Sequence, residues 1–225
     1  MKVLGIDCSL NRLNLGLSEN GRTISESSRN AEGILTEIFT DEISDLLKGA
    51  SVGLSDLSAI AITTGPGSFT GLRVGLATVK AICWSRKLPL VTMSTFEAVA
   101  YQFRDRKNPI SVICPSHDKK LLGGNFHTLN GLPQLQGELF IAEPDEIAKK
   151  VTNSLTVIDI GIHPHLGEIR KFLPRGAVLI NNEQSYLTGS TVAGLGTQMF
   201  ERGLTTDPKD AEPIYLQKTI YRSKH

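Results

Sequence analysis

The chain has 225 residues, enough for one large domain or two modest lobes. Its composition, 40% hydrophobic and 21% charged, is that of an ordinary globular protein, and no uninterrupted apolar run is long enough to span a membrane. A net charge of +1 argues against a protein that holds RNA by charge alone, because neutralising phosphates needs a basic face.

The opening residues and the cysteines bear on where the protein works. The start is not a secretory signal, because Asp7 interrupts a short apolar run. We therefore expect a cytoplasmic protein without a membrane partner. Neither a disulfide nor a metal site is expected, because the three cysteines are far apart and form no C-x-x-C pair. They are Cys8, Cys83 and Cys114.

The first part of the chain predicts an antiparallel meander and then a helix. Strands are expected at Lys2–Asp7, at Leu13–Ser18, where apolar and polar residues alternate, and at Arg22–Ser28. Asn20-Gly21 suits the hairpin turn between the last two. The helix is expected over about Ala31–Lys48. Its apolar residues cover an arc of roughly 220°, so part of it should face another helix or another chain.

A glycine-rich segment, Gly65–Arg73, separates an expected strand at Ala59–Thr64 from an expected helix at Thr70–Arg86. Backbone N–H groups and the helix dipole make such a position a candidate anion site. The segment is neither a Walker A loop nor a G-x-G-x-x-G motif. A phosphate site and a tight turn without a ligand therefore both remain open.

The helix after this loop carries small residues on one face. Gly71 and Gly75 are four residues apart, and Ala77 and Thr78 follow. Small side chains let another backbone approach closely. Either a helix of another chain packs there, or the helix packs tightly inside its own lobe.

The rest of the chain predicts shorter elements. A polar stretch near Arg104–Pro109 predicts a lobe boundary, with lobes at 1–103 and 104–225 and the last residues able to pack back on the first lobe. No internal repeat is visible. The expected elements are a strand at Leu88–Thr92, a helix capped by Ser94 or Thr95, paired strands at Ile110–Cys114 and Leu121–Leu129 around a turn at His117–Lys120, a short helix at Pro144–Lys150, strands at Leu155–Ile160 and Ala177–Ile180, and a final helix at Leu187–Arg202.

Two features near the end leave alternatives open. His163 and His165 form the one close histidine pair, for which a surface turn is simpler than a metal site. After Tyr215 the chain is basic, which suits a solvated terminus or a modest contact with nucleic acid. The residues of this tail are Lys218, Arg222, Lys224 and His225.

The run Ala61–Lys80, with Gly65–Arg73 at its centre, closely resembles the central motif of the TsaB (YeaZ) family. The opening Leu4–Ser9 resembles the start of that family, and Pro213–Leu216 resembles its last strand. The similarity is dense over residues 1 to about 100 and thin afterwards.

The resemblance implies an α/β protein of the actin-like fold shared by acetate kinase, hexokinase, hsp70 and actin, with two lobes. It also implies a non-catalytic scaffold in the synthesis of threonylcarbamoyladenosine beside the anticodon of tRNA. In that family a paralogue, TsaD, holds the metal and transfers the threonylcarbamoyl group. A small ATPase, TsaE, joins the pair, and tRNA is reached through the complex.

The resemblance places the contact with the TsaD-like paralogue on the first two helices. The expected interface residues are Ile34, Leu35, Ile38, Phe39, Gly71, Leu72, Val74, Gly75 and Thr78. No tightly bound cofactor is expected, and ATP or ADP would bind only at the junction with the partner. The residues that would line a phosphate or nucleotide there are Asp7, Gly65, Gly67, Ser68, Thr70 and Arg73.

One alternative function and one further expectation accompany this interpretation. The chain could be a stand-alone ATP-dependent enzyme or peptidase of the actin-like superfamily, although no Ser-His-Asp set or H-E-x-x-H motif stands out. Without its partner, the chain is also expected to form a homodimer, because exposed apolar faces tend to find partners.

Overall fold

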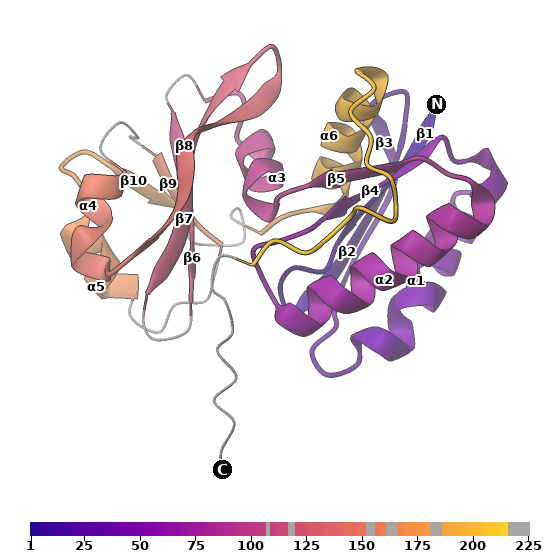
Figure 1. Cartoon of the computed structure of the whole chain (residues 1–225), viewed down its shortest axis with the longest axis horizontal. Coiled ribbons are helices and arrows are strands. Elements are labelled where there is room, and N and C mark those ends of the chain that lie inside the picture. The colour runs from indigo at the N-terminus through magenta and orange to yellow at the C-terminus, as the bar shows by residue number, and fades with distance from the viewer. Residues whose placement is uncertain (107–108, 117–119, 152–155, 161–165, 181–185, 216–225) are drawn as a thin grey trace.

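The computed structural model of the chain is described here for residues 1–106, 109–116, 120–151, 156–160, 166–180 and 186–215. Two lobes lie side by side, each with a five-stranded sheet (Figure 1). The strands are β1 (Lys2–Asp7), β2 (Arg12–Glu19), β3 (Arg22–Asn30), β4 (Ala59–Thr63), β5 (Leu90–Met93), β6 (Ile110–Pro115), β7 (Leu121–Leu129), β8 (Leu132–Ala142), β9 (Thr156–Asp159) and β10 (Val178–Ile180). The helices are α1 (Leu35–Gly49), α2 (Phe69–Arg86), α3 (Thr95–Gln102), α4 (Ile147–Lys150), α5 (Leu166–Phe172) and α6 (Gly189–Glu201).

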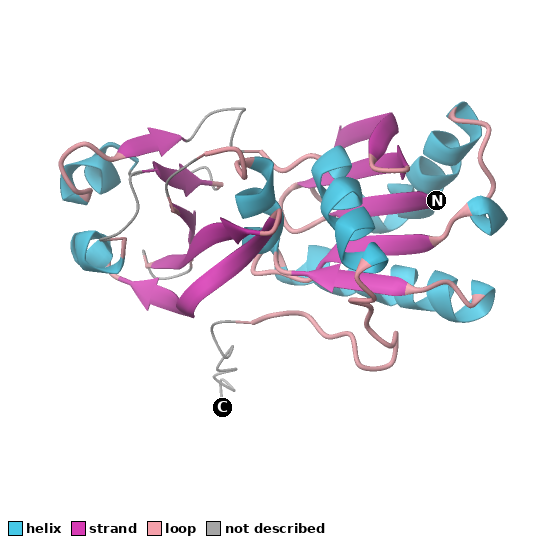
Figure 2. Cartoon of the chain, turned by 90° about the horizontal axis from the view of Figure 1, so that it is seen from above, coloured by secondary structure: helices cyan, strands magenta, loops and turns pink. Residues whose placement is uncertain are grey.

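The first sheet has the order β3-β2-β1-β4-β5, with β1 antiparallel to β2 and parallel to β4. Helices α1 and α2 cover one face and α6 covers the other (Figures 1 and 2). Successive side chains of a strand point to opposite faces of the sheet, so each strand contributes alternate residues to the two helical layers. Leu13, Leu15 and Leu17 thus belong to the core under α1 and α2.

Glycine lets α6 lie almost on the backbone of the sheet. A methyl group at Gly16 would overlap the backbone of Gly189, and one at Gly5 would overlap the backbone of Ala193. Beside this contact, the hydroxyls of Ser18 and Thr197 are hydrogen bonded at 2.8 Å. The final helix of the chain is therefore part of the first lobe's core.

The second sheet has the order β10-β9-β6-β7-β8. This order repeats that of the first sheet, since β6 pairs antiparallel with β7 and parallel with β9, as β1 does with β2 and β4. The repeat exists in the topology, although the sequence shows none. Helices α4 and α5 contribute Ile147 and Ile169 to the core on one face.

The two lobes share a core. Phe96, Val99 and Tyr101 of α3 belong to one buried cluster together with residues of both sheets. Val3 on β1 and Phe126 on β7 are members of the same cluster. Helix α3 therefore joins the lobes by apolar burial as well as by the chain itself.

The segment after α6, residues 203–215, runs along the first lobe; we call it the strap. Thr206 forms an isolated antiparallel bridge with Leu90 at the edge of β5. Farther on, Lys80 Nζ donates to the Ala211 carbonyl oxygen at 2.9 Å, and the Ile214 N–H donates to Thr64 O at 2.7 Å. Residues 213–215 contact the loop after β4 in this way without forming a regular strand.

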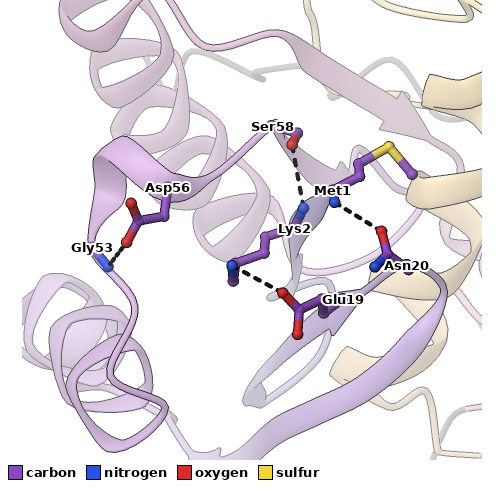
Figure 3. A network of polar contacts seen from close by, with 7 residues as sticks. All are labelled: Met1, Lys2, Glu19, Asn20, Gly53, Asp56 and Ser58. Atoms are coloured by element: carbon purple, nitrogen blue, oxygen red, sulfur yellow. Dashed lines mark hydrogen bonds and ion pairs between the residues drawn. The ribbon is translucent and has the colours of Figure 1, made fainter.

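A polar network fastens the beginning of the chain (Figure 3). The Met1 amino group donates to Asn20 Oδ1 at 2.8 Å, and the Lys2 N–H donates to Ser58 Oγ at 3.2 Å. Lys2 Nζ lies 3.0 Å from Glu19 Oε1. These contacts tie β1 to the β2–β3 hairpin, whose turn has positive φ at Asn20 and Gly21, as the sequence predicts.

Most expected elements are present, with three differences. The first helix begins at Leu35 rather than at Ala31, because the Ala31 N–H donates to Asn11 O and the chain turns at Gly33 with φ +75°. Strand β8 was not expected, since its apolar residues do not alternate regularly with polar ones and many of its residues are exposed. Helix α5 was not expected either. The predicted turn at 117–120 and the histidines at 163 and 165 lie partly or wholly outside the described residues.

Replacing Gly16 by alanine should lower the free energy of unfolding by about 3 kcal/mol, because α6 must move away from the sheet to admit the methyl group. The matched control is Gly49→Ala at the end of α1, where a methyl group meets nothing within 4 Å; its effect should stay below about 1 kcal/mol. Urea unfolding measures both. Equal stability of the two variants would contradict the close packing of α6.

Candidate functional site

The glycine loop after β4 is held against the turn between β1 and β2. The Ser68 N–H donates to Ser9 O at 2.6 Å, and Ser68 Oγ caps α2 by accepting from the Gly71 N–H at 3.2 Å. A methyl group at Gly67 would overlap Ser9 O, so only glycine permits this approach. Gly65 has φ +111°, which also favours glycine. Packing inside the lobe therefore accounts for both glycines.

Asp7 lies at the end of β1 and is fully buried. One carboxylate oxygen accepts hydrogen bonds from Thr63 Oγ1 at 2.7 Å and from the Ser9 N–H at 3.1 Å. The other accepts from Asn14 Nδ2 at 3.1 Å. Both oxygens thus accept hydrogen bonds from the same lobe. They connect the end of β1 to β2, to the end of β4 and to the turn that follows β1.

Arg73 fastens the end of the strap to the beginning of α2. Its guanidinium lies 3.7 Å from the centre of the Phe69 ring, and its Nε donates to the Tyr215 hydroxyl at 3.0 Å. The rings of Phe69 and Tyr215 are 5.3 Å apart between centroids. Of the expected loop residues, Gly67, Thr70 and Arg73 are exposed, while Asp7 and Gly65 are buried. Anion binding by this loop remains a prediction.

The small residues Gly71 and Gly75 face inward. A methyl group at Gly71 would overlap Cys8 O, and one at Gly75 would overlap Cys8 Sγ. The Cys8 thiol donates to Gly71 O at 3.2 Å. The glycines therefore let α2 lie close to the end of β1. Of the two alternatives that the sequence leaves open, these positions fit tight packing inside the lobe.

Four of the nine expected interface positions are buried in their own lobe: Phe39, Gly71, Leu72 and Gly75. The other five reach the surface wholly or in part: Ile34, Leu35, Ile38, Val74 and Thr78. Of the expected interface residues, a partner could thus contact these five from the surface of the two helices.

The outward side of α2 carries a row that sequence reasoning did not single out. Val74, Ala77, Ala81 and Trp84 follow one another at intervals of three, four and three residues, which places them on one helical face. Ala77 and Ala81 are exposed, Val74 is half-buried, and the Trp84 side chain is 72% exposed. The sequence could have indicated this surface through its spacing, because the four residues repeat at heptad spacing on the side of α2 opposite Leu72 and Val79. We call these four residues the α2 row.

The α2 row ends at a depression of about 630 Å³ between the end of α2 and the strap. Trp84, Leu88, Pro89 and Thr205 are among the residues that line it. An exposed tryptophan beside an apolar depression is typical of a protein–protein contact, in which tryptophan often carries much of the binding energy.

The three cysteines are buried and free. Burial raises the pKa of the Cys83 thiol to about 11, and burial together with Asp159 raises the pKa of Cys114 to about 12. Burial and then Asp7 also raise the pKa of Cys8. Because the thiolate is the nucleophile, none of the three is suited to thiol catalysis at neutral pH. Within the described ranges, no three His, Cys, Asp or Glu residues are grouped as a metal site requires.

Comparison with known proteins shows which proteins this chain is similar to. The family model described as TsaD, tRNA N6-adenosine threonylcarbamoyltransferase, matches residues 29–130. The tRNA threonylcarbamoyladenosine biosynthesis protein TsaB of Escherichia coli is 24% identical over 98% of the chain and 96% of its own length. The Bacillus subtilis protein of the same name is 29% identical over 59% of the chain and 58% of its own length.

Solved structures agree in fold. YeaZ from Pseudomonas aeruginosa superposes with a TM-score of 0.80 at 21% identity, over 96% of this chain and 99% of that one. A ROK hexokinase from Thermus thermophilus superposes with a TM-score of 0.55 at 14% identity, over 90% of this chain and all of that one. The molecule is therefore a two-lobed α/β protein of the actin-like fold.

Within that fold, the similarity to TsaB extends over nearly the whole chain, whereas the TsaD family model matches only its middle part. The comparisons therefore support a similarity to the TsaB (YeaZ) family over nearly the whole chain. In the described part of the chain, no helix combines the length and apolar character needed to cross a membrane.

The raised thiol pKa values predict how stability depends on pH. Unfolded thiols ionise above about pH 8.5, whereas Cys114 stays protonated in the folded protein up to about pH 12. Between these values the unfolded state binds fewer protons, so the free energy of unfolding should fall with rising pH, by up to about 1.4 kcal/mol per pH unit for this thiol. Below about pH 8.5 the thiol should have no such effect.

The comparison of wild type with Cys114→Ala isolates this contribution from other groups that titrate at high pH. Urea unfolding at about pH 8 and about pH 10 should show a smaller loss of stability for the variant. Equal losses would mean that Cys114 ionises as easily in the folded protein as in the unfolded chain.

Proposed function

We propose that this chain is a non-catalytic partner in the synthesis of threonylcarbamoyladenosine in tRNA, and that it supports a TsaD-like paralogue that performs the transfer. The observation that carries the proposal is the exposed α2 row in a chain similar to TsaB over nearly its full length. The row gives a helix of another protein an apolar strip with two small residues for close approach.

The arrangement around the glycine loop supports a scaffold rather than an enzyme. Both carboxylate oxygens of Asp7 accept hydrogen bonds from groups inside the lobe. The Ser68 N–H and the Arg73 guanidinium are likewise engaged with Ser9 and with the strap. These groups hold α2 and the strap in place, which keeps the outward face of α2 rigid for a partner.

The remaining parts of the proposal concern the assembly. The TsaD-like paralogue contacts the outward sides of α1 and α2, and a TsaE-like ATPase joins the pair. A nucleotide, if bound, sits at the junction near Thr70 and the glycine loop. tRNA is reached through the complex, in the cytoplasm. Without the paralogue, a second copy of the chain occupies the same face.

Reconstitution tests the proposed function. Threonylcarbamoyl transfer to tRNA is measured with a cognate TsaD-like protein and TsaE-like ATPase, with and without this chain. Transfer should depend on adding the chain, which alone should transfer nothing. If the other two proteins work equally well without it, the chain is not their partner.

The face itself is tested with Ala81→Arg. A long charged side chain in the middle of the α2 row should abolish pairing and transfer, and folding should be unaffected because Ala81 is exposed. The control is Gln136→Arg at an exposed position on β8 of the second lobe, which should pair normally. Sedimentation of the mixed proteins measures pairing. Normal pairing of Ala81→Arg would remove α2 from the interface.

Trp84→Ala tests the end of the row. Truncating a tryptophan that a partner buries often costs about 2 kcal/mol or more of binding free energy, which corresponds to a roughly 30-fold higher dissociation constant. Titration calorimetry with the TsaD-like partner measures the change. A change below about threefold would place Trp84 outside the contact.

A further inference from the structure

A row of three carboxylates runs along the outward side of α1. Glu37, Asp41 and Asp45 are all exposed and are spaced one helical turn apart. They lie opposite Phe39, Ile43 and Leu47, the residues through which α1 packs on the sheet. We call Glu37, Asp41 and Asp45 the acidic row.

The acidic row is unfavourable for the isolated chain. Like charges four residues apart on a helix repel each other. The helix dipole favours Glu37 in the first turn of α1 but disfavours Asp45 toward the C-terminal end. Among the described residues, Glu37 and Asp41 form no ion pair. Asp45 has only Lys48, at 4.0 Å with both side chains 75% exposed, which is a weak contact.

The neighbouring carboxylate shows the contrast. Glu42 lies on another side of α1 and is paired with Arg29 of β3. The carboxylate that faces the sheet is thus paired, whereas among the described residues the outward three have only the weak contact of Asp45 with Lys48.

The acidic row and the α2 row lie on the same side of the first lobe. Helices α1 and α2 lie in the layer that covers one face of the sheet (Figures 1 and 2) and contact each other. The buried residues of each helix face the sheet, so the two exposed rows lie on the sides of the helices away from it. A protein that packs on the α2 row therefore comes close to the acidic row. An apolar strip bordered by one sign of charge is the pattern by which paired helices choose a partner.

We infer that Glu37, Asp41 and Asp45 determine partner choice, and that the paralogue presents lysine or arginine side chains opposite them. The inference rests on the proposed function and adds the chemistry of the partner's surface. Charge complementarity of this kind speeds association and suppresses wrong partners. A second copy of this chain brings a second acidic row, so self-pairing on this face is weaker than pairing with a basic paralogue and gives way to it when the paralogue is present.

The test compares two variants of the full chain that each lose three exposed carboxylates. The first combines Glu37→Gln, Asp41→Asn and Asp45→Asn. The matched control combines Glu138→Gln, Asp145→Asn and Glu201→Gln, which are exposed positions away from α1 and α2. Both change the net charge equally. Stopped-flow kinetics with the cognate TsaD-like protein is recorded between about 20 mM and about 500 mM salt.

At low salt the acidic-row variant should associate about 10-fold more slowly than wild type, with a flatter dependence on salt and a dissociation rate constant within about threefold of wild type. The control should match wild type. If wild type pairs with the paralogue and the two variants behave alike, the inference is overturned and the proposed function stands. If wild type does not pair at all, the proposed function and the inference both fail.

Discussion

The structure depends on close contact between helices and the backbone of the central strands. On one face α6 approaches β1 and β2 where Gly5 and Gly16 have no side chains. On the other, α2 approaches the end of β1 through Gly71 and Gly75. Because β1 is held from both sides, α6 is part of the first lobe although it follows the second lobe in the chain, and α2 is fixed with its other face outward.

The same constraint decides what each side of α2 can do. The inward side is committed to Cys8 and to the core, and the outward side is left with Val74, two alanines and Trp84. Asp7 and Arg73 contribute by fastening the strand ends and the strap around this helix. In this account Asp7 and Arg73 have a structural role, which is to keep the proposed docking surface rigid.

Much of the fold could be predicted from the sequence, because the signals were local. The alternation of Leu13, Leu15 and Leu17 predicts β2 and its buried face, and Asn20-Gly21 predicts the hairpin. The glycine loop and the capped start of α2 were also correctly placed between strand and helix. Strand β8 was missed because an exposed edge strand carries no apolar alternation, although Asn130-Gly131 marks its turn with positive φ.

The candidate surface could be predicted less well, for a physical reason. Helix α2 has apolar or small residues on both sides, so its sequence does not reveal which side meets the sheet. The expected interface includes residues from both sides of α2, such as Gly75 and Val74, and only the packing of Gly71 and Gly75 against Cys8 shows which side faces the sheet. The repeated topology of the two sheets was likewise invisible, since it is kept by strand order and not by sequence.

The central claim is that the partner docks on the outward face of α1 and α2, and the single tryptophan of the chain, Trp84, allows a direct measurement. The chain labelled with 5-fluorotryptophan should give one fluorine resonance, from a side chain that is 72% exposed. Adding the unlabelled TsaD-like paralogue should shift or broaden this resonance, and tRNA alone should leave it unchanged. An unchanged resonance while sedimentation shows that the pair has formed would contradict the account.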